Sequence, residues 1–279
     1  MILDRYVFGE VKRISPEAPI PVLNVDEAEE RLGGAGNVAA NLRAMGASVS
    51  LVSVIGADRW GEGLRGLLTD AGVDATGLVV DEARQTVRKS RLMSGGQQIL
   101  RVDWEGSVEE TEEVSGQLRS QAARLLEEVD AVILSDYGKG ALSSETCAHV
   151  ISLARERGLP VVVDPKGSDY TRYKGATLVT PNRKEAELAL GYELADGAEL
   201  SNGARELAEQ SGIDGVVITL GAGGIHYRVS SGAEGRVAAK ARSVYDVTGA
   251  GDTVVAQLAL YLGAGAPLAD AVQLANLGA

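Results

Sequence analysis

The chain is poor in cysteine, histidine and aromatic residues. It has one Cys, two His and one Phe in 279 residues, and aromatic residues make up only 4%. A single cysteine excludes an intrachain disulfide, so we interpret Cys147, inside an expected helix, as a packing residue. His149 and His226 lie far apart in the sequence and show no metal-ligand spacing. The composition therefore does not indicate a disulfide scaffold or a histidine-based metal site.

Long apolar runs and an excess of positive charge are also missing. No apolar run approaches 18 residues and no signal peptide is recognisable, so we expect a cytoplasmic protein without a membrane partner. Lys and Arg total 27 against 39 Asp and Glu, which gives a formal net charge of −12. Such a charge disfavours nucleic acid as a partner. A phosphorylated ligand would have to be held by local basic groups.

What the chain does contain is glycine and a regular alternation of helices and apolar strands. There are 35 glycines, and 45% of the residues are hydrophobic. We expect helices at 112–127, 144–157, 183–191 and 201–211, and strands at 131–134, 160–163, 177–180 and 215–220. Buried strands joined by helical crossovers predict an α/β fold with a doubly wound, mostly parallel sheet. Ligands in such sheets bind beyond the carboxyl ends of the strands.

The first hundred residues predict strands and a hairpin outside this alternation. Residues 1–6 are interpreted as the tail of a strand that enters a loop, and residues 20–25 as a short strand. Residues 86–104 predict a basic hairpin around Gly95-Gly96. No linker marks a second domain, so residues 1–279 are expected to form one.

The run from Tyr245 to Thr253 joins a strand-like segment to an apolar helix through a glycine-rich turn. Backbone N–H groups of Gly249, Ala250 and Gly251 can converge at the helix start, where the helix dipole favours an anion. A carboxylate beside an anion site, here Asp252, is suited to act as a general base toward a hydroxyl that attacks a phosphoryl group. The alternative is that Asp252 is an ordinary helix cap.

Residues 34–39, Gly-Ala-Gly-Asn-Val-Ala, match the G-x-G-x-x-A fingerprint of dinucleotide-binding proteins, with Asp58 as a candidate ribose-binding acid. Against a nicotinamide enzyme, the glycines follow the polar residues 26–31 rather than a buried strand. The other interpretation is close approach of the backbone to a polyhydroxyl ligand, with Asn37 bonded to its hydroxyls. The G-x-x-x-x-G-K-[ST] motif is absent, which excludes a P-loop site.

Two further motifs lie at strand–helix and strand–strand junctions. Asn182 and Glu185 are one helical turn apart, where they can hold hydrated Mg²⁺ and phosphate oxygens or form a capping box. Thr219, Gly221 and Gly224 either let the backbone approach a ligand or form a turn into the following strand. Locally, these motifs leave both alternatives open.

Taken together and in this order, the four motifs resemble the ribokinase-like sugar kinases, the phosphofructokinase-B (pfkB) family. The resemblance covers essentially the whole chain. Residues 3–6, 14–19, 134–140 and 164–167 are similar to one branch of that family, the kinases of D-glycero-β-D-manno-heptose 7-phosphate, which are often fused to an adenylyltransferase.

The resemblance implies a role for each motif. Asp252 would be the base, and Gly249, Ala250 and Gly251 the anion hole for the transferring phosphoryl group. Asn182 and Glu185 would organise Mg²⁺ and the ATP phosphates, with Thr219, Gly221, Gly224 and Asn276 at the nucleotide. Asp246 and Thr248 would hold a monovalent cation such as K⁺, and Gly33, Gly34 and Asn37 the sugar.

The implied reaction is ATP-dependent phosphorylation of the anomeric hydroxyl of the heptose 7-phosphate to the 1,7-bisphosphate, in ADP-heptose (lipopolysaccharide core) biosynthesis. On charge alone, Lys89, Arg91, Arg101 or Lys139 would bind the 7-phosphate. The resemblance also implies that segments of about 12–32 and 86–104 form a small β lid, and that a homodimer forms through this lid.

The sequence departs from the family pattern at both ends. The pattern has a strand that ends in Gly-Asp ahead of the position of Met1, and a closing segment beyond Asn276-Leu277-Gly278-Ala279. We therefore expect a chain truncated at both ends, with the fold retained and weak or no kinase activity. Another sugar or sugar-phosphate kinase of this fold, or a non-catalytic sugar-binding or dimerising module, are the alternatives.

Overall fold

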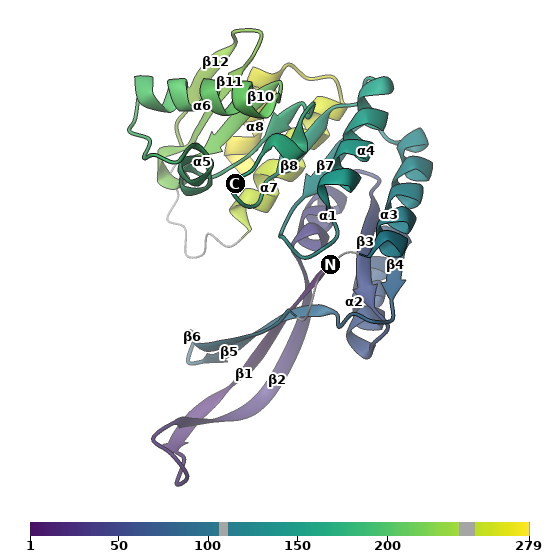
Figure 1. Cartoon of the computed structure of the whole chain (residues 1–279). Coiled ribbons are helices and arrows are strands. Elements are labelled where there is room, and N and C mark those ends of the chain that lie inside the picture. Colours follow the sequence, from purple (N-terminus) through teal and green to yellow (C-terminus); the bar gives the residue numbers. More distant parts are fainter. Residues whose placement is uncertain (106–110, 240–248, 279) are drawn as a thin grey trace.

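A computed structural model describes residues 1–105, 111–239 and 249–278 (Figure 1). The strands are β1 Ile2–Ile14, β2 Pro21–Gly33, β3 Ser50–Gly56, β4 Asp74–Asp81, β5 Val87–Ser94, β6 Gln97–Trp104, β7 Val132–Ser135, β8 Val161–Asp164, β9 Leu178–Val179, β10 Gly215–Thr219, β11 Ile225–Val229 and β12 Glu234–Val237. The α-helices are α1 Ala35–Ala44, α2 Arg59–Asp70, α3 Glu112–Leu125, α4 Ser144–Glu156, α5 Arg183–Leu190, α6 Ala198–Ser211, α7 Ala250–Gly263 and α8 Leu268–Gly278. Short 3-10 turns lie at Leu126–Glu128, Thr171–Tyr173 and Gly221–Gly223.

The main sheet has six strands in the order β12-β11-β10-β9-β8-β7. Strands β7 to β10 are parallel, and β11 and β12 add antiparallel strands at one edge. Val161, Val162 and Val163 of β8 are all fully buried, as expected for a strand covered on both faces. The doubly wound, mostly parallel α/β sheet that the sequence predicts is therefore confirmed.

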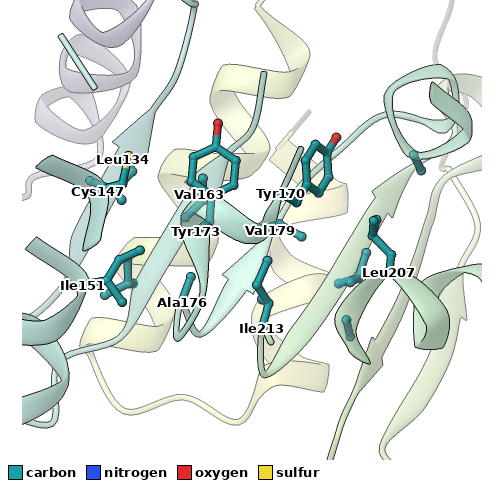
Figure 2. Close-up of a cluster of buried hydrophobic side chains, with 14 of the residues drawn as sticks. Leu134, Cys147, Ile151, Val163, Tyr170, Tyr173, Ala176, Val179, Leu207 and Ile213 are labelled. Atoms are coloured by element: carbon teal, nitrogen blue, oxygen red, sulfur yellow. The ribbon is translucent and has the colours of Figure 1, made fainter. Parts of the chain in front are cut away.

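Helices on the two faces divide the core of this sheet. Val161 and Val163 pack toward α4 and α6, whereas Val162 packs toward α7 and α8. Figure 2 shows the first side, where Cys147 of α4 lies among aliphatic side chains and Tyr173. The predicted packing role of Cys147 is confirmed by its complete burial. No helix in the described parts of the chain is long and apolar enough to cross a bilayer.

A second sheet, which we call the lid sheet, has the order β2-β1-β5-β6 and reaches away from the main sheet (Figure 1). The hairpin β5–β6 around Gly95-Gly96 confirms the prediction for residues 86–104. The predictions for β1 and β2 were wrong in extent, because each is a 13-residue strand. The acidic segment 26–30 belongs to β2, which is paired antiparallel with β1. The outward exposure of this segment removes the apolar alternation by which strands are recognised in a sequence.

The parallel pair β3–β4 forms a third, two-stranded sheet. Within the described residues, β3 pairs only with β4, and β7 pairs only with β8. A cavity of about 500 Å³ lies between these two sheets and is lined on one side by residues 48–53 and on the other by residues 128–135. Helix α1 begins immediately after β2 and packs against α7, so it links the lid sheet to the main sheet.

Candidate active site

Asp252 lies in the first turn of α7, directly after the glycine-rich turn. Gly249 precedes the helix, and no side chain of the described residues caps the first turn. Among these residues the N–H groups at this end therefore have no side-chain acceptor, which is the condition for binding an anion. The prediction that Gly249, Ala250 and Gly251 present N–H groups beside Asp252 fits this local geometry, and the interpretation of Asp252 as a helix cap does not.

Both oxygens of the Asp252 carboxylate accept a short hydrogen bond. Asn37 Nδ2 of α1 donates to Oδ2 at 2.6 Å, and the Tyr137 hydroxyl, beyond β7, donates to Oδ1 at 2.6 Å. One turn farther along α1 and one residue farther along α7, Asn41 Nδ2 donates to Thr253 Oγ1 at 3.3 Å. The amino-terminal parts of α1 and α7 are thus joined at the site, and the sequence candidates Asn37 and Asp252 meet across 215 residues.

The loop after β7 is fixed by a buried carboxylate. Asp136, only 5% exposed, accepts bonds from the Gly138 N–H and the Tyr173 hydroxyl at 2.7 Å each, and Arg172 lies 3.5 Å away. This loop carries Tyr137 to Asp252. Burial, with the nearby Asp252 carboxylate, raises the pKa of Tyr137, so its hydroxyl remains a hydrogen-bond donor.

Asp164 ends β8 and faces the same site. Burial, together with the neighbouring carboxylates of Asp252 and Glu185, raises the pKa of Asp164 to about 7, while Lys166 opposes this shift. Accumulated carboxylates of this kind are stabilised by a cation. Among the residues that the structure describes, no three acidic, His or Cys side chains form a metal-binding group. One or two carboxylates together with substrate phosphates are nevertheless the usual ligands of Mg²⁺.

Asn182 and Glu185 form a reciprocal capping box at the start of α5. Asn182 Oδ1 accepts from the Glu185 N–H at 3.0 Å, and Glu185 Oε2 accepts from the Asn182 N–H at 3.1 Å. Lys166 Nζ lies 3.5 Å from Glu185 Oε1. The capping box, which the sequence left open as an alternative, is therefore present. The other carboxylate oxygen, Glu185 Oε1, faces the Lys166 ammonium group.

The proposed nucleotide residues begin at the carboxyl end of β10, where Thr219 forms an isolated bridge pair with Asn182. Thr219 ends β10, and Gly221 lies in the turn into β11, so the hairpin alternative is also present. At Gly224 a Cβ would come within 2.0 Å of the Val237 carbonyl oxygen, and φ is +84°. Gly224 is therefore required for packing against β12 whatever else it does. Asn276 of α8 donates to the Ala238 carbonyl at 2.8 Å.

Three of the four proposed phosphate-binding residues already have acidic partners. Arg91 pairs with Asp4 at 2.6 Å, Arg101 with Asp103 at 3.0 Å, and Lys139 with Glu105 at 2.7 Å. No ion pair involves Lys89 within residues 1–105, 111–239 and 249–278. In β5, Lys89 and Arg91 share one face of the lid sheet.

The glycines before α1 adjoin the same face of the lid sheet. At Gly33 a Cβ would lie 2.6 Å from Asp4 Oδ2, and at Gly34 it would lie 3.2 Å from the Tyr137 ring. The preceding β2 is an exposed antiparallel strand, which argues against the dinucleotide alternative. Asp58 instead caps α2: although burial acts to raise its pKa, bonds from Thr86, Gly61 and Trp60 lower it.

Asp246 and Thr248, the expected monovalent-cation residues, lie outside the described residues. Sequence reasoning assigned no role to Tyr137 or Asp164. Each belongs to a polar cluster at the end of an apolar strand: Ser135-Asp136-Tyr137 and Asp164-Pro165-Lys166. This position, where ligands of such sheets bind, was the available sequence signal for a site residue.

The sequence model of the pfkB family of carbohydrate kinases matches residues 4–279. The chain belongs to the pfkB family. Kinases of this family use ATP, typically with a divalent metal ion. The expectations of a ribokinase-like fold and of an ATP-dependent sugar kinase are confirmed.

Curated pfkB relatives extend beyond the matched region. The chain is 45% identical to the bifunctional protein HldE of Desulfatibacillum aliphaticivorans and 46% identical to that of Geobacter metallireducens. In both cases all of this chain is covered but only 57% of the relative.

Solved structures of pfkB kinases have the same fold. Phosphofructokinase-2 of Escherichia coli with fructose 6-phosphate bound superposes with a TM-score of 0.78 and 26% identity, covering 98% of this chain and 88% of the other. A mutant of that enzyme gives a TM-score of 0.81 at the same identity and coverage.

Proposed function

We propose that the chain phosphorylates the anomeric hydroxyl of D-glycero-D-manno-heptose 7-phosphate with ATP, giving the 1,7-bisphosphate used in ADP-heptose (lipopolysaccharide core) biosynthesis. The choice of a heptose is supported by the resemblance of residues 134–140 and 164–167 to kinases of this sugar and by the identity to HldE proteins. The observation that carries the chemistry is Asp252 beside the uncapped amino end of α7.

In this reaction Asp252 accepts the proton of the anomeric hydroxyl as its oxygen attacks the γ-phosphorus of ATP, and ADP leaves. The first N–H groups of α7, from Gly249 to Gly251, bind the negative charge of the phosphoryl group in transfer. Asn37 orients the carboxylate through its bond to Oδ2. Gly33 and Gly34 let the sugar approach the backbone.

The divalent ion is proposed to be Mg²⁺, held near Glu185 through water and near Asp164. The high pKa of Asp164 and its acidic neighbours fit a cation there. Thr219, Gly221, Gly224 and Asn276 are proposed to border the nucleotide, with K⁺ at Asp246 and Thr248.

The 7-phosphate is proposed to bind on the lid sheet. Lys89 is the first ligand, because no acidic partner occupies it among the described residues, and Arg91 beside it can be shared with Asp4. Arg101 and Lys139 complete the basic surface.

A homodimer through the lid sheet is supported by exposed apolar side chains. Six large ones lie on its strands or at the β1–β2 tip: Val11, Ile14, Ile20, Val25, Ile99 and Leu100. Apolar surface of this kind marks protein–protein contacts.

We also propose that the kinase activity of residues 1–279 is weak. Asn37 is on α1, beside the β3–β4 sheet, and Asp252 is on α7, beside the main sheet, with the cavity of about 500 Å³ between these sheets. A catalytic base is held less firmly when the elements that position it pack on two sheets that share no hydrogen bonds.

The test is ADP release with ATP and a panel of acceptors: heptose 7-phosphate, fructose 6-phosphate and ribose. We expect turnover with the heptose phosphate and a loss of at least about 100-fold in Asp252→Asn. Preference for another acceptor would reassign the substrate. Equal ATP turnover in the parent and Asp252→Asn would favour a binding module.

A further inference from the structure

The hydrogen bond from Tyr137 to Asp252 is not explained by the proposed base and anion hole. It joins a loop after β7 to the first turn of α7 at 2.6 Å, across 115 residues. Asn37 takes up the other carboxylate oxygen, also at 2.6 Å. The carboxylate is therefore held by two donors from two different elements.

We propose, resting on the function above, that Tyr137 is a positioning residue: its hydroxyl fixes the orientation of the Asp252 carboxylate toward the acceptor hydroxyl of the sugar. Each carboxylate oxygen can accept two hydrogen bonds. With one position on each oxygen filled by Tyr137 and Asn37, the remaining positions on one side are left for the sugar hydroxyl.

The surroundings of Tyr137 hold it in this position. Its ring packs on Gly34, where a Cβ would lie only 3.2 and 3.3 Å from the ring atoms Cε2 and Cδ2. The preceding residue, Asp136, anchors the loop through the Gly138 N–H and the Tyr173 hydroxyl. A residue supported by packing and by a buried network can orient a reacting group reproducibly.

The chemistry of the phenol suits a donor and excludes a base. Burial and the adjacent carboxylate raise the pKa of Tyr137, so the hydroxyl keeps its proton throughout the neutral range. The group therefore keeps the Asp252 carboxylate oriented by a lasting hydrogen bond.

The test is Tyr137→Phe, which keeps the ring on Gly34 and removes only the hydroxyl. We expect kcat to fall roughly 10- to 100-fold with little change in KM for the sugar phosphate. The matched control is Tyr192→Phe, which removes a tyrosine–carboxylate bond of 2.7 Å to Glu206 at the surface.

A second measurement does not need turnover. A double-mutant cycle of Tyr137→Phe and Asp252→Ala, read by the midpoint of urea unfolding, should show less loss in the double variant than the sum of the single losses. Additive losses, or a kcat unchanged in Tyr137→Phe, would overturn the proposal. If the parent phosphorylates no sugar of the panel, the proposed function fails, and the cycle alone decides whether Tyr137 holds Asp252.

Discussion

At the scale of single residues, Lys89 differs from the other three proposed phosphate-binding residues in having no ion pair in the described parts of the chain. Arg91, Arg101 and Lys139 are each paired with a carboxylate. A phosphate that binds Lys89 breaks no ion pair of the described residues, whereas one that binds the others must compete with Asp or Glu. We therefore expect Lys89 to contribute most to binding of the 7-phosphate.

Lys89→Met should raise KM for the sugar phosphate by roughly 10- to 100-fold, since a charge-assisted hydrogen bond contributes about 1.5–3 kcal/mol. The rate with the unphosphorylated sugar should not change. Initial-rate measurements check both, with Lys174→Met, at an exposed lysine remote from the lid sheet, as the control. Equal losses with both sugars would place Lys89 outside the phosphate site.

Asp164 predicts a pH dependence of stability. Its folded-state pKa is raised from 3.8 to about 7, so the folded protein binds more protons than the unfolded chain between about pH 4 and 7. Through this group, the free energy of unfolding falls as the pH rises across that interval. The penalty is complete above about pH 7.

Asp164→Asn removes this ionisation and should raise the free energy of unfolding at pH 8 by up to about 4 kcal/mol, from roughly three pKa units. At pH 4 the two proteins should differ little. Urea denaturation at both pH values measures the difference, and a variant equally stabilised at pH 4 and 8 would contradict the role of ionisation. Kinase activity should fall, because Asp164 is proposed to support the metal ion.

At the scale of elements, what the sequence could and could not predict depended on how each element is covered. Strand β8 is buried on both faces and was recognisable from three consecutive valines. Strands β1 and β2 have mixed polar residues on exposed faces, and only pairing over 12 residue positions makes them strands. Asp252 was found because its motif is contiguous. The contact between Tyr137 and Asp252 could not be predicted, because it joins residues 115 positions apart and depends on how the intervening chain folds.

The lid sheet predicts an association surface. Leu100 of β6 is 53% exposed, with Ile99 beside it, and Val25 of β2 is 59% exposed. An apolar side chain buried at the centre of an interface contributes strongly to binding, and a charge in its place is left without a partner.

Leu100→Asp should raise the dissociation constant of the dimer at least about 10-fold, as measured by sedimentation equilibrium. The control is Leu188→Asp, since Leu188 is 62% exposed but lies on α5 in another part of the fold. A monomeric parent would refute the lid dimer. Equal dissociation in both variants would place the interface elsewhere.

At the scale of the whole molecule, the interruption between β3 and β7 separates two sheets that run side by side. Each would be expected to keep its own hydrogen bonds when the other opens, because no backbone bond of the described residues crosses the cavity. The β3–β4 sheet has only two strands, and two-stranded units are marginal without support.

We therefore expect native-state hydrogen exchange to show lower protection for the β3–β4 amides than for the β8 and β10 amides. The difference should appear at urea concentrations well below the global transition. Equal opening free energies in the two sheets would show that packing across the cavity makes them one cooperative unit. Mass spectrometry of peptic fragments resolves the two regions.

The bonds from Asn37 to Asp252 and from Asn41 to Thr253 make this separation relevant to catalysis. They connect α1, which packs beside β3, to α7 of the main sheet. Partial unfolding of the β3–β4 region would therefore release the Asp252 carboxylate while the main sheet is still folded. The temperature at which kinase activity is lost is then set by the unfolding of the β3–β4 region. Circular dichroism, which is dominated by the larger main-sheet region, would still report a native protein.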